Sequence, residues 1–260
     1  MKATIIKSIY KGTCITIVNQ FNVKKITKAL AAIMLMTVVM FTTGCKKDNA
    51  DGDGTVNGHT YVDLGLPSGT LWAACNVGAN SPEEYGDYFA WGETQPKETY
   101  DWSTYQYCNG SIYTLTKYCN VAFCGNNGFI DNLTVLQPMD DAATANWGNG
   151  WCTPTDDQWR ELIDNTIASW ITQNGVNGRL FTASNGNSLF LPAAGFRWGL
   201  ELDGVSYFGG YWLSSLDTGN PSNAWYFNFG FGSGYCGGMS SYRGRGSGLS
   251  VRAVHSARQN

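Results

Sequence analysis

The chain has 260 residues, of which 43% are hydrophobic and 14% aromatic, enough for one large or two small domains with a well-packed core. Charged residues make up only 14%, so surface polarity must come from Asn, Ser, Thr, Gly and tyrosine hydroxyls. Residues 1–45 hold six of the 17 basic residues and no acid, which leaves 11 basic and 20 acidic residues, a net charge of −9, in the rest. That balance excludes a nucleic-acid partner, which would need a basic face.

The N-terminal segment has the pattern of a bacterial signal peptide. Residues 24–28 are basic, and residues 29–41 form an apolar run too short to span a bilayer comfortably. The run ends in Thr42-Thr43-Gly44-Cys45, which resembles a lipobox with Thr42 in the place usually held by Leu. We expect residues 1–45 to be a lipoprotein signal peptide with lipid attached to Cys45. Residues 46–55 then form a flexible tether, and residues 56–256 form one ligand-binding domain.

The first half of this domain predicts short strands and long loops. Alternation indicates strands at 59–66 and 71–79, with a turn at 67–70 between them. A third aromatic stretch covers 88–93, and the region 94–137 lacks periodicity, so we expect long loops with short strands.

Two helices are predicted next. The first covers 138–147, with Asp140 and Asp141 in its first turn, where the helix dipole favours anions. The second covers 155–164, where Thr155 and Gln158 fit a capping box. A hairpin should follow, with strands at 178–183 and 188–192, and 193–197 should continue it.

The C-terminal end predicts a buried frame and an exposed surface. Strands are expected at 211–215, 224–229 and 249–254, and the Gly-, Ser-, Tyr- and Arg-rich segment 230–248 is expected to be a loop. The residues expected in the core are Trp212, Phe227, Phe229, Phe231, Leu249 and Val251. Arg252 is expected to make a structural hydrogen bond.

Catalytic and metal-binding patterns are weak. The chain has eight cysteines, and the closest approach to a metal-binding pair is Cys119-x4-Cys124. Disulfides are compatible with an extracytoplasmic location, but their pairing stays open. The two histidines, His59 and His255, flank the domain, so we expect no catalytic residue, no metal and no cofactor.

Six motifs together resemble one family. They look like the Fibrobacter-type major paralogous domain, which is abundant in gut Bacteroidetes lipoproteins and similar to formylglycine-generating enzyme and C-type-lectin-like folds. The resemblance implies an α+β, C-type-lectin-like fold of small twisted antiparallel sheets, one or two helices and long irregular loops. The charged segment 46–54 after Cys45 resembles the export tag of Bacteroidetes surface lipoproteins, so we expect a lipid-anchored location in the cell envelope, in the outer membrane facing the cell surface. The motifs are YVDLGLPSGTLWA (61–73), YFAWGE (88–93), WCTPT (151–155), LPAAGFR (191–197), GYWLSS (210–215) and LSVRAV (249–254).

Some relatives in this group are variable proteins of diversity-generating retroelements, whose last strands and loops present a diversified ligand-binding face. By residue type and strand alternation, we expect the C-terminal face to bind a protein or other macromolecule. The alternatives are a glycan-binding module and an enzyme related to formylglycine-generating enzyme. The predicted ligand-binding residues are Tyr226, Asn228, Ser233, Tyr235, Ser240, Tyr242, Arg243 and Arg245.

Overall fold

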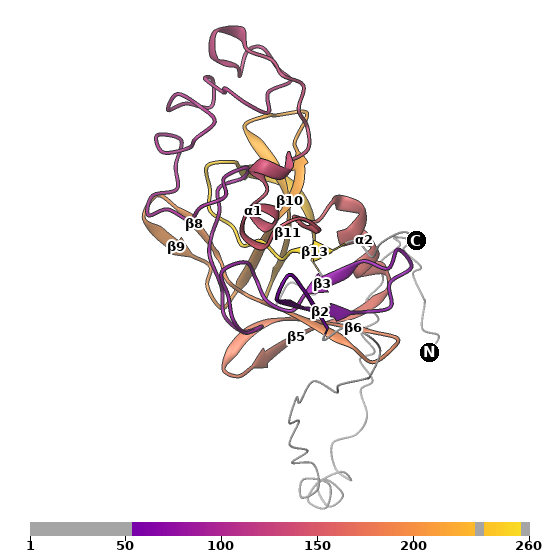
Figure 1. Cartoon of the computed structure of the whole chain (residues 1–260). Coiled ribbons are helices and arrows are strands. Elements are labelled where there is room, and N and C mark those ends of the chain that lie inside the picture. Colours follow the sequence, from indigo (N-terminus) through magenta and orange to yellow (C-terminus); the bar gives the residue numbers. More distant parts are fainter. Residues whose placement is uncertain (1–53, 232–236, 256–260) are drawn as a thin grey trace, which may run out of the picture. The chain divides into compact units, whose positions relative to one another are not determined.

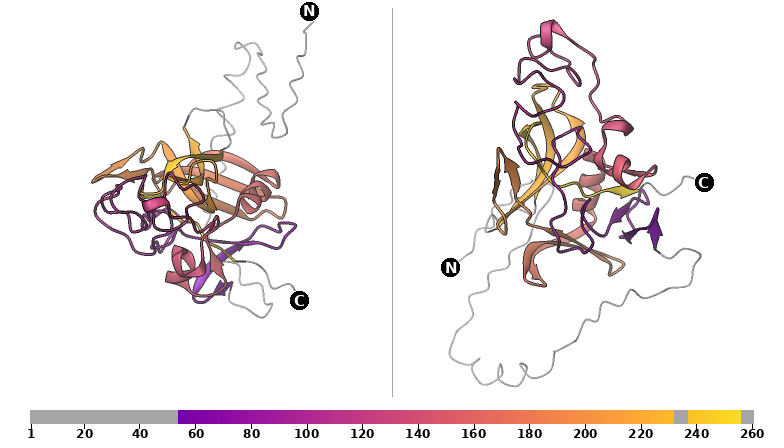
Figure 2. Two further views of the ribbon diagram at one scale, coloured as in Figure 1. Left: turned by 90° about the horizontal axis from the view of Figure 1, so that it is seen from above. Right: turned by 60° about the vertical axis from the view of Figure 1, so that its left-hand side comes forward.

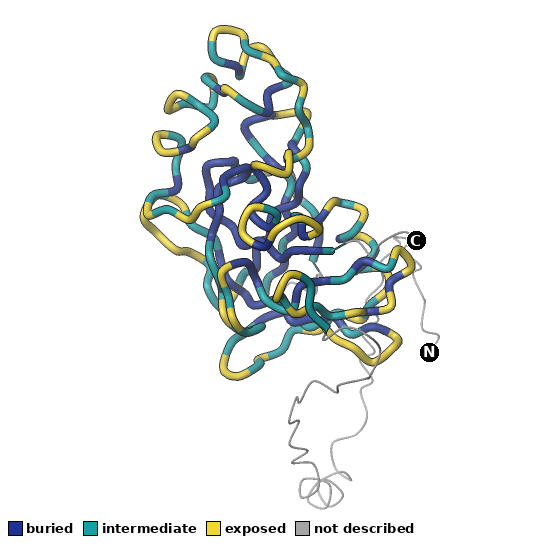
Figure 3. The backbone as a smooth tube through the Cα atoms, in the orientation of Figure 1, coloured by how far each residue is buried: buried dark blue, intermediate teal, exposed yellow. Residues whose placement is uncertain are grey.

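The computed structural model describes residues 54–231 and 237–255. Antiparallel strands dominate this part of the chain, in several small sheets and a curled half-barrel, with few short helices (Figure 1). This confirms the prediction of small antiparallel sheets with few helices. Buried backbone concentrates in the central strands, whereas the connecting loops are largely exposed (Figure 3).

The two ends of the described chain meet in one five-stranded sheet. Its strand order is β1-β2-β3-β13-β4. The last strand lies between β3 and β4, since Val254 pairs with Trp72 on one side and with Cys152 on the other. The strands are β1 (Thr55–Val56), β2 (His59–Asp63), β3 (Leu71–Ala73), β13 (Val254–His255) and β4 (Trp151–Cys152).

Helix α2 (Asp156–Asp164) confirms the predicted capping box. The Thr155 hydroxyl accepts a hydrogen bond from Gln158 N, and the Gln158 side chain accepts one from Thr155 N. The apolar face of the helix places Trp159 and Leu162 in the core. The indole of Trp159 stacks on the ring of Phe227, with ring centroids 4.3 Å apart.

A three-stranded sheet follows α2 along the chain. It consists of β5 (Thr166–Gln173), β6 (Val176–Ala183) and β7 (Ser188–Pro192), in that order. The β6–β7 hairpin was predicted and is confirmed. Strand β5 was not predicted, because its alternation is weak: Ile167 points to solvent at 78% exposure. Asn174 and Gly175 both have positive φ and form the two-residue turn between β5 and β6, which the Asn-Gly pair in the sequence indicates.

The C-terminal sheet contains β10 (Phe208–Leu216), β11 (Asn223–Gly230) and β12 (Gly238–Gly244). The pairing of β11 with each of its two neighbours, β10 and β12, shifts register at Trp225. On the β12 side two residues lie opposite Trp225, and on the β10 side three residues do. Such bulges locally increase the twist of a sheet and re-aim side chains.

Both faces of this sheet are buried. Tyr211, Phe227 and Phe229 pack toward α2 and the β5–β6–β7 sheet, together with Phe181. On the opposite face, Trp212, Ala224 and Tyr226 pack against residues of the loops that precede α1, including Phe89, Trp91 and Tyr118. Each fully buried aromatic side chain contributes roughly 1.5–3 kcal/mol of hydrophobic stabilisation.

The long loops predicted for 94–137 are present. Apart from the turn η1 (Asn126–Gly128), this region has only isolated bridges among its residues. It projects away from the strands, as the magenta segment in Figures 1 and 2 shows. It leads into the turn η2 (Pro138–Asp140) and helix α1 (Ala142–Trp147), so the helix predicted at 138–147 is divided in two at Asp141.

Several boundaries differ from the prediction. The strand expected at 71–79 ends at Ala73, and the stretch 88–93 makes only a single bridge at Phe89. Residues 193–197 do not extend β7; instead β8 (Phe196–Trp198) pairs with β9 (Glu201–Asp203) in a separate hairpin. The expected loop 230–248 contains β12. The strand expected at 249–254 is a chain of single bridges that ends in β13, because this segment changes partners at nearly every residue.

Candidate functional site

The structure describes the side chains of four of the eight predicted ligand-binding residues. Ser233 and Tyr235 lie outside the described residues. Ser240 and Tyr242 belong to β12, of which the backbone alone is described at these two positions. Tyr226, Asn228, Arg243 and Arg245 remain to be placed.

Two of these four are buried, so the prediction that they are presented at the surface is wrong. Tyr226 is 8% exposed and Arg245 is 0% exposed. Alternation along β11 correctly separates its two faces, but the face of Tyr226 is covered by loops from earlier in the chain. The unbroken apolar run at 224–227 is the signal that indicates a strand buried on both faces.

Arg245 makes structural contacts with the long loops. Its guanidinium donates hydrogen bonds to the backbone oxygens of Lys117 and Tyr118, at 3.3 and 2.9 Å from Nη1. It also lies over the rings of Trp91 and Tyr105, 5.6 and 5.3 Å from their centroids. These contacts fix the segment around residue 118 against the C-terminal end of the sheet.

Arg252 is the other fully buried arginine, and its predicted structural role is confirmed. Its Nε donates to Asn76 Oδ1 at 2.8 Å, and Nη1 donates to the backbone oxygens of Ala73 and Ala74. Burial lowers the pKa of this guanidinium, and the tyrosine hydroxyl of Tyr211 opposes that shift.

Arg243 is half-buried, and its environment differs from that of the two buried arginines. Its guanidinium carbon lies 4.0 Å from the centroid of the Phe196 ring and 5.5 Å from that of Tyr226. Its Nε is buried without a hydrogen-bond partner among the described residues. The structure therefore brings Tyr226 and Arg243 together. The Tyr226 ring lies beneath the guanidinium and is not itself exposed to a ligand.

The β8–β9 hairpin beside Arg243 carries an exposed apolar surface that the sequence analysis missed. Trp198 is 46% exposed, Leu200 71% and Leu202 38%. Phe196 and Trp198 lie on the same face of β8, two residues apart, so the exposed indole and the ring under Arg243 share one side of the hairpin. An apolar turn, Trp198-Gly199-Leu200, is the available signal, because turns without a binding role are usually polar. We call Trp198, Leu200 and Arg243 the hairpin face; Leu202 pairs with Arg197 and therefore lies on the other side of the hairpin.

The opposite end of the C-terminal sheet is also partly apolar. Asn228 donates from its side chain to Gly238 O at 3.1 Å, which connects β11 to β12. Phe231, expected in the core, is 65% exposed because it lies just beyond the end of β11. Tyr207, 67% exposed, accepts a hydrogen bond at its backbone oxygen from Phe231 N.

The adjacent acids Asp140 and Asp141 have separate structural roles. Asp141 caps α1, accepting from Ala143 N and Thr144 N, and also accepts from Thr153. Asp140 is not a cap. Its carboxylate accepts hydrogen bonds from Tyr107 at 2.6 Å, Tyr118 at 2.5 Å and Lys117 Nζ at 2.6 Å.

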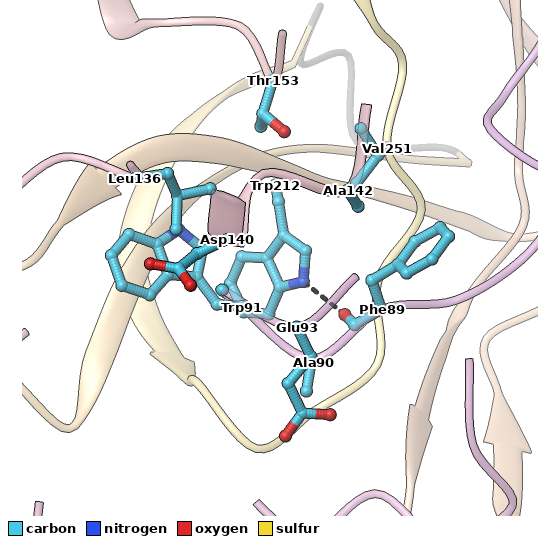
Figure 4. Close-up of a pocket in the computed structure, with 11 residues that line it drawn as sticks. Phe89, Ala90, Trp91, Glu93, Leu136, Asp140, Ala142, Thr153, Trp212 and Val251 are labelled. Atoms are coloured by element: carbon cyan, nitrogen blue, oxygen red, sulfur yellow. Dashed lines mark hydrogen bonds between the residues drawn. The ribbon is translucent and has the colours of Figure 1, made fainter. Parts of the chain in front are cut away.

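Asp140 and Glu93 line a small pocket of about 10 Å³, shown in Figure 4. Trp212 lines this pocket, and its indole nitrogen donates a hydrogen bond to Phe89 O at 2.7 Å. Glu93 is engaged by Lys97 Nζ at 2.9 Å. Each of the two carboxylates is thus paired with a lysine, Asp140 with Lys117 and Glu93 with Lys97.

The two histidines lie near one aromatic cluster. His59 stacks on Trp147 with ring centroids 4.0 Å apart, and Trp151 contacts both His59 and His255 edge-on. Burial lowers the pKa of His59. Within the described residues, no group of three or more His, Cys, Asp or Glu side chains could hold a metal ion. In the same part of the chain, no helix is long and apolar enough to cross a membrane.

No family model, no curated protein and no solved structure matches the chain.

Proposed function

We propose that the chain is a surface-anchored lipoprotein of the bacterial envelope that binds a protein ligand through its C-terminal face. The observation that carries the proposal is the hairpin face: a guanidinium that lies over two aromatic rings, beside a hairpin whose tip exposes Trp198 and Leu200. Trp and Arg at such positions dominate the energy of many protein interfaces, at about 2 kcal/mol or more each. The exposed Leu200 favours a protein over a sugar, because leucine offers neither hydrogen bonds nor a flat ring for stacking.

The resemblance to the Fibrobacter-type major paralogous domain supports this proposal, and with it a C-type-lectin-like fold. Its motif residues Trp72, Trp91, Trp151 and Trp212 are all fully buried, as residues that define a fold should be. An experimental structure whose C-terminal strands followed a different order from a C-type-lectin-like domain would contradict this assignment.

Ligand binding is tested with three variants of the full chain displayed on cells. Trp198→Ser with Leu200→Ser removes the apolar tip, and Arg243→Ala removes the guanidinium. Ile167→Ser is the matched control, since Ile167 is equally exposed but lies on β5. Proteins cross-linked to the domain at the hairpin face should be lost in the first two variants and kept in the third. Equal recovery from all three would overturn the site.

A glycan-binding module for carbohydrate capture is the second candidate. The exposed rings of Trp198 and Tyr207 favour it, since such rings stack on sugars. A glycan array probed with the wild type and with Trp198→Ser separates the two functions. Specific glycan signals that disappear with the indole would favour the sugar ligand.

An enzyme related to formylglycine-generating enzyme is the third candidate and has the least support. That chemistry needs two cysteines side by side in a cleft. Cys119 and Cys124 share one turn of the chain, but they line neither the pocket at Trp212 nor the surface hollow at His59.

Membership of the diversified receptors is tested by comparing the same locus in sibling strains. Substitutions should concentrate between positions 228 and 243, whereas the buried Tyr226 and Arg245 should stay constant. Anchoring is tested with Cys45→Ser, which should release the protein from the membrane fraction. Protease added to intact cells should degrade the wild-type domain if it faces outward.

A further inference from the structure

Cys119 and Cys124 both donate a hydrogen bond to the backbone oxygen of Val121, in the long loop region. Cys119 Sγ donates to Val121 O at 3.2 Å, and Cys124 N donates to the same oxygen at 2.9 Å. The sulfur of Cys119 and the nitrogen of Cys124 are therefore separated by no more than the sum of these two distances. The chain between them reverses direction through the turn closed by Cys124.

The two thiols differ in accessibility. Cys119 is fully buried, whereas Cys124 is half-buried. Burial raises the pKa of the Cys124 thiol, the neighbouring Cys119 raises it further, and Arg245 opposes both effects.

We propose that Cys119 and Cys124 form a disulfide when the chain folds in an oxidising compartment. The thiolate of Cys124, the more accessible partner, attacks the disulfide of a thiol–disulfide oxidoreductase and releases one of its thiols. The thiolate of Cys119 then attacks the sulfur of Cys124 and releases the second thiol. The two cysteines lose two protons and two electrons, and the oxidoreductase disulfide is reduced to a dithiol.

The disulfide would add a covalent restraint to a segment that is otherwise held by packing and hydrogen bonds. Cys119 is held at its backbone by Asp131, whose Oδ1 accepts from Cys119 N at 2.9 Å. Cys124 O accepts from Leu115 N at 2.9 Å. A link between the two residues would therefore connect the loop segments around Leu115, Val121 and Asp131, and it would constrain the unfolded chain. This inference does not depend on ligand binding.

The test uses the full chain exported to a bacterial envelope, with free thiols alkylated by N-ethylmaleimide before digestion. Trypsin should release residues 118–160 as one peptide, because the sequence has no Lys or Arg between Lys117 and Arg160. This peptide contains Cys119, Cys124 and Cys152. We expect a single label on it, located on Cys152 by fragmentation, and three labels when the protein is reduced first.

Three labels without reduction, or a link that includes Cys152, would overturn the pairing. Cys152→Ser is the matched control and should leave an unlabelled peptide. Cys119→Ser should expose Cys124 to alkylation. In the wild type, reduction should lower Tm by about 5 °C. The Cys119→Ser, Cys124→Ser double variant should show no such shift, and an equal shift in both proteins would contradict the proposal.

Discussion

The guanidinium of Arg243 stacks over Phe196, with the guanidinium carbon 4.0 Å from the ring centroid. Arg243 and Phe196 come from β12 and β8, so the contact joins the C-terminal sheet to the exposed hairpin. Among the described residues, no carboxylate forms an ion pair with this arginine. The aromatic rings are therefore its principal partners within the fold.

This contact should be measurable as a coupling energy. In a double-mutant cycle of Arg243→Met and Phe196→Leu, we expect an interaction of about 0.5–1 kcal/mol in urea unfolding, the range of partly exposed cation–π pairs. The comparison pair is Arg160 and Asp156, an exposed ion pair on α2, for which about 0.3–0.5 kcal/mol is expected. A coupling near zero for Arg243 and Phe196 would show that the stacking contributes nothing.

Arg245 should matter for stability and not for binding. Replacing it by Met leaves two buried backbone oxygens, those of Lys117 and Tyr118, without their donor. We expect a loss of about 2–4 kcal/mol, since each unsatisfied buried group costs about 1–3 kcal/mol. Thermal unfolding followed by circular dichroism measures the loss, and Arg243→Met should cost less. Ligand binding by the folded Arg245→Met protein at low temperature should be unchanged. A selective loss of binding would place Arg245 at the interface after all.

Asp140 should give a characteristic pH dependence. Burial alone would raise its pKa, but hydrogen bonds from Lys117, Tyr107 and Tyr118 outweigh burial and hold the pKa below its ordinary value of 3.8. The unfolded state therefore binds a proton more readily than the folded state. The stabilisation is complete above pH values near 3.8 and is lost as the pH falls through the folded-state pKa.

Asp140→Asn removes this contribution. At neutral pH we expect a loss of about 3–5 kcal/mol, because Lys117 then lies beside a neutral partner. Below pH 3.8 the difference from the wild type should shrink. Asp141, whose pKa is raised by burial, acts in the opposite direction and is present in both proteins, so the difference isolates Asp140. A difference that stays constant from pH 2 to pH 7 would contradict the assignment.

The capping box of α2 offers a prediction of smaller size. Thr155→Ala removes the hydroxyl that accepts from Gln158 N, and we expect a loss of about 1 kcal/mol. Thr116→Ala is a suitable control, because Thr116 is an exposed threonine in the long loop region. Equal effects of the two substitutions in chemical denaturation would show that the cap adds nothing beyond ordinary surface threonine.

Local patterns in the sequence predicted the local structure well. The capping box defined α2, and the Asn-Gly-Asn turn defined the β6–β7 hairpin. These features depend on residues within a few positions of each other, so their chemistry is visible in the sequence. Strand β5 escaped detection because Ile167 faces solvent, although Asn174-Gly175 marks its turn.

The sequence could not predict which distant segments of the chain cover the second face of the C-terminal sheet. The alternation of β11 distinguishes Phe227 from Tyr226, yet nothing nearby shows that a loop around residues 91–118 covers the second face. Arg245 is buried for the same reason, because its acceptors lie more than 120 positions earlier in the chain. Of the predicted site residues, Arg243 keeps its place in the proposed site, and its partner Phe196 was found only in the structure.

The position of β13 has a kinetic consequence. Val254 joins β3 to β4, so the five-stranded sheet is incomplete until residues 254 and 255 have been synthesised. Phe89 and Leu249 likewise pair across most of the domain's length. Contacts of such high sequence separation slow folding, since a large loop must close before they form. A nascent chain therefore remains without its closing strand, and unable to complete its core, until Val254 has left the ribosome.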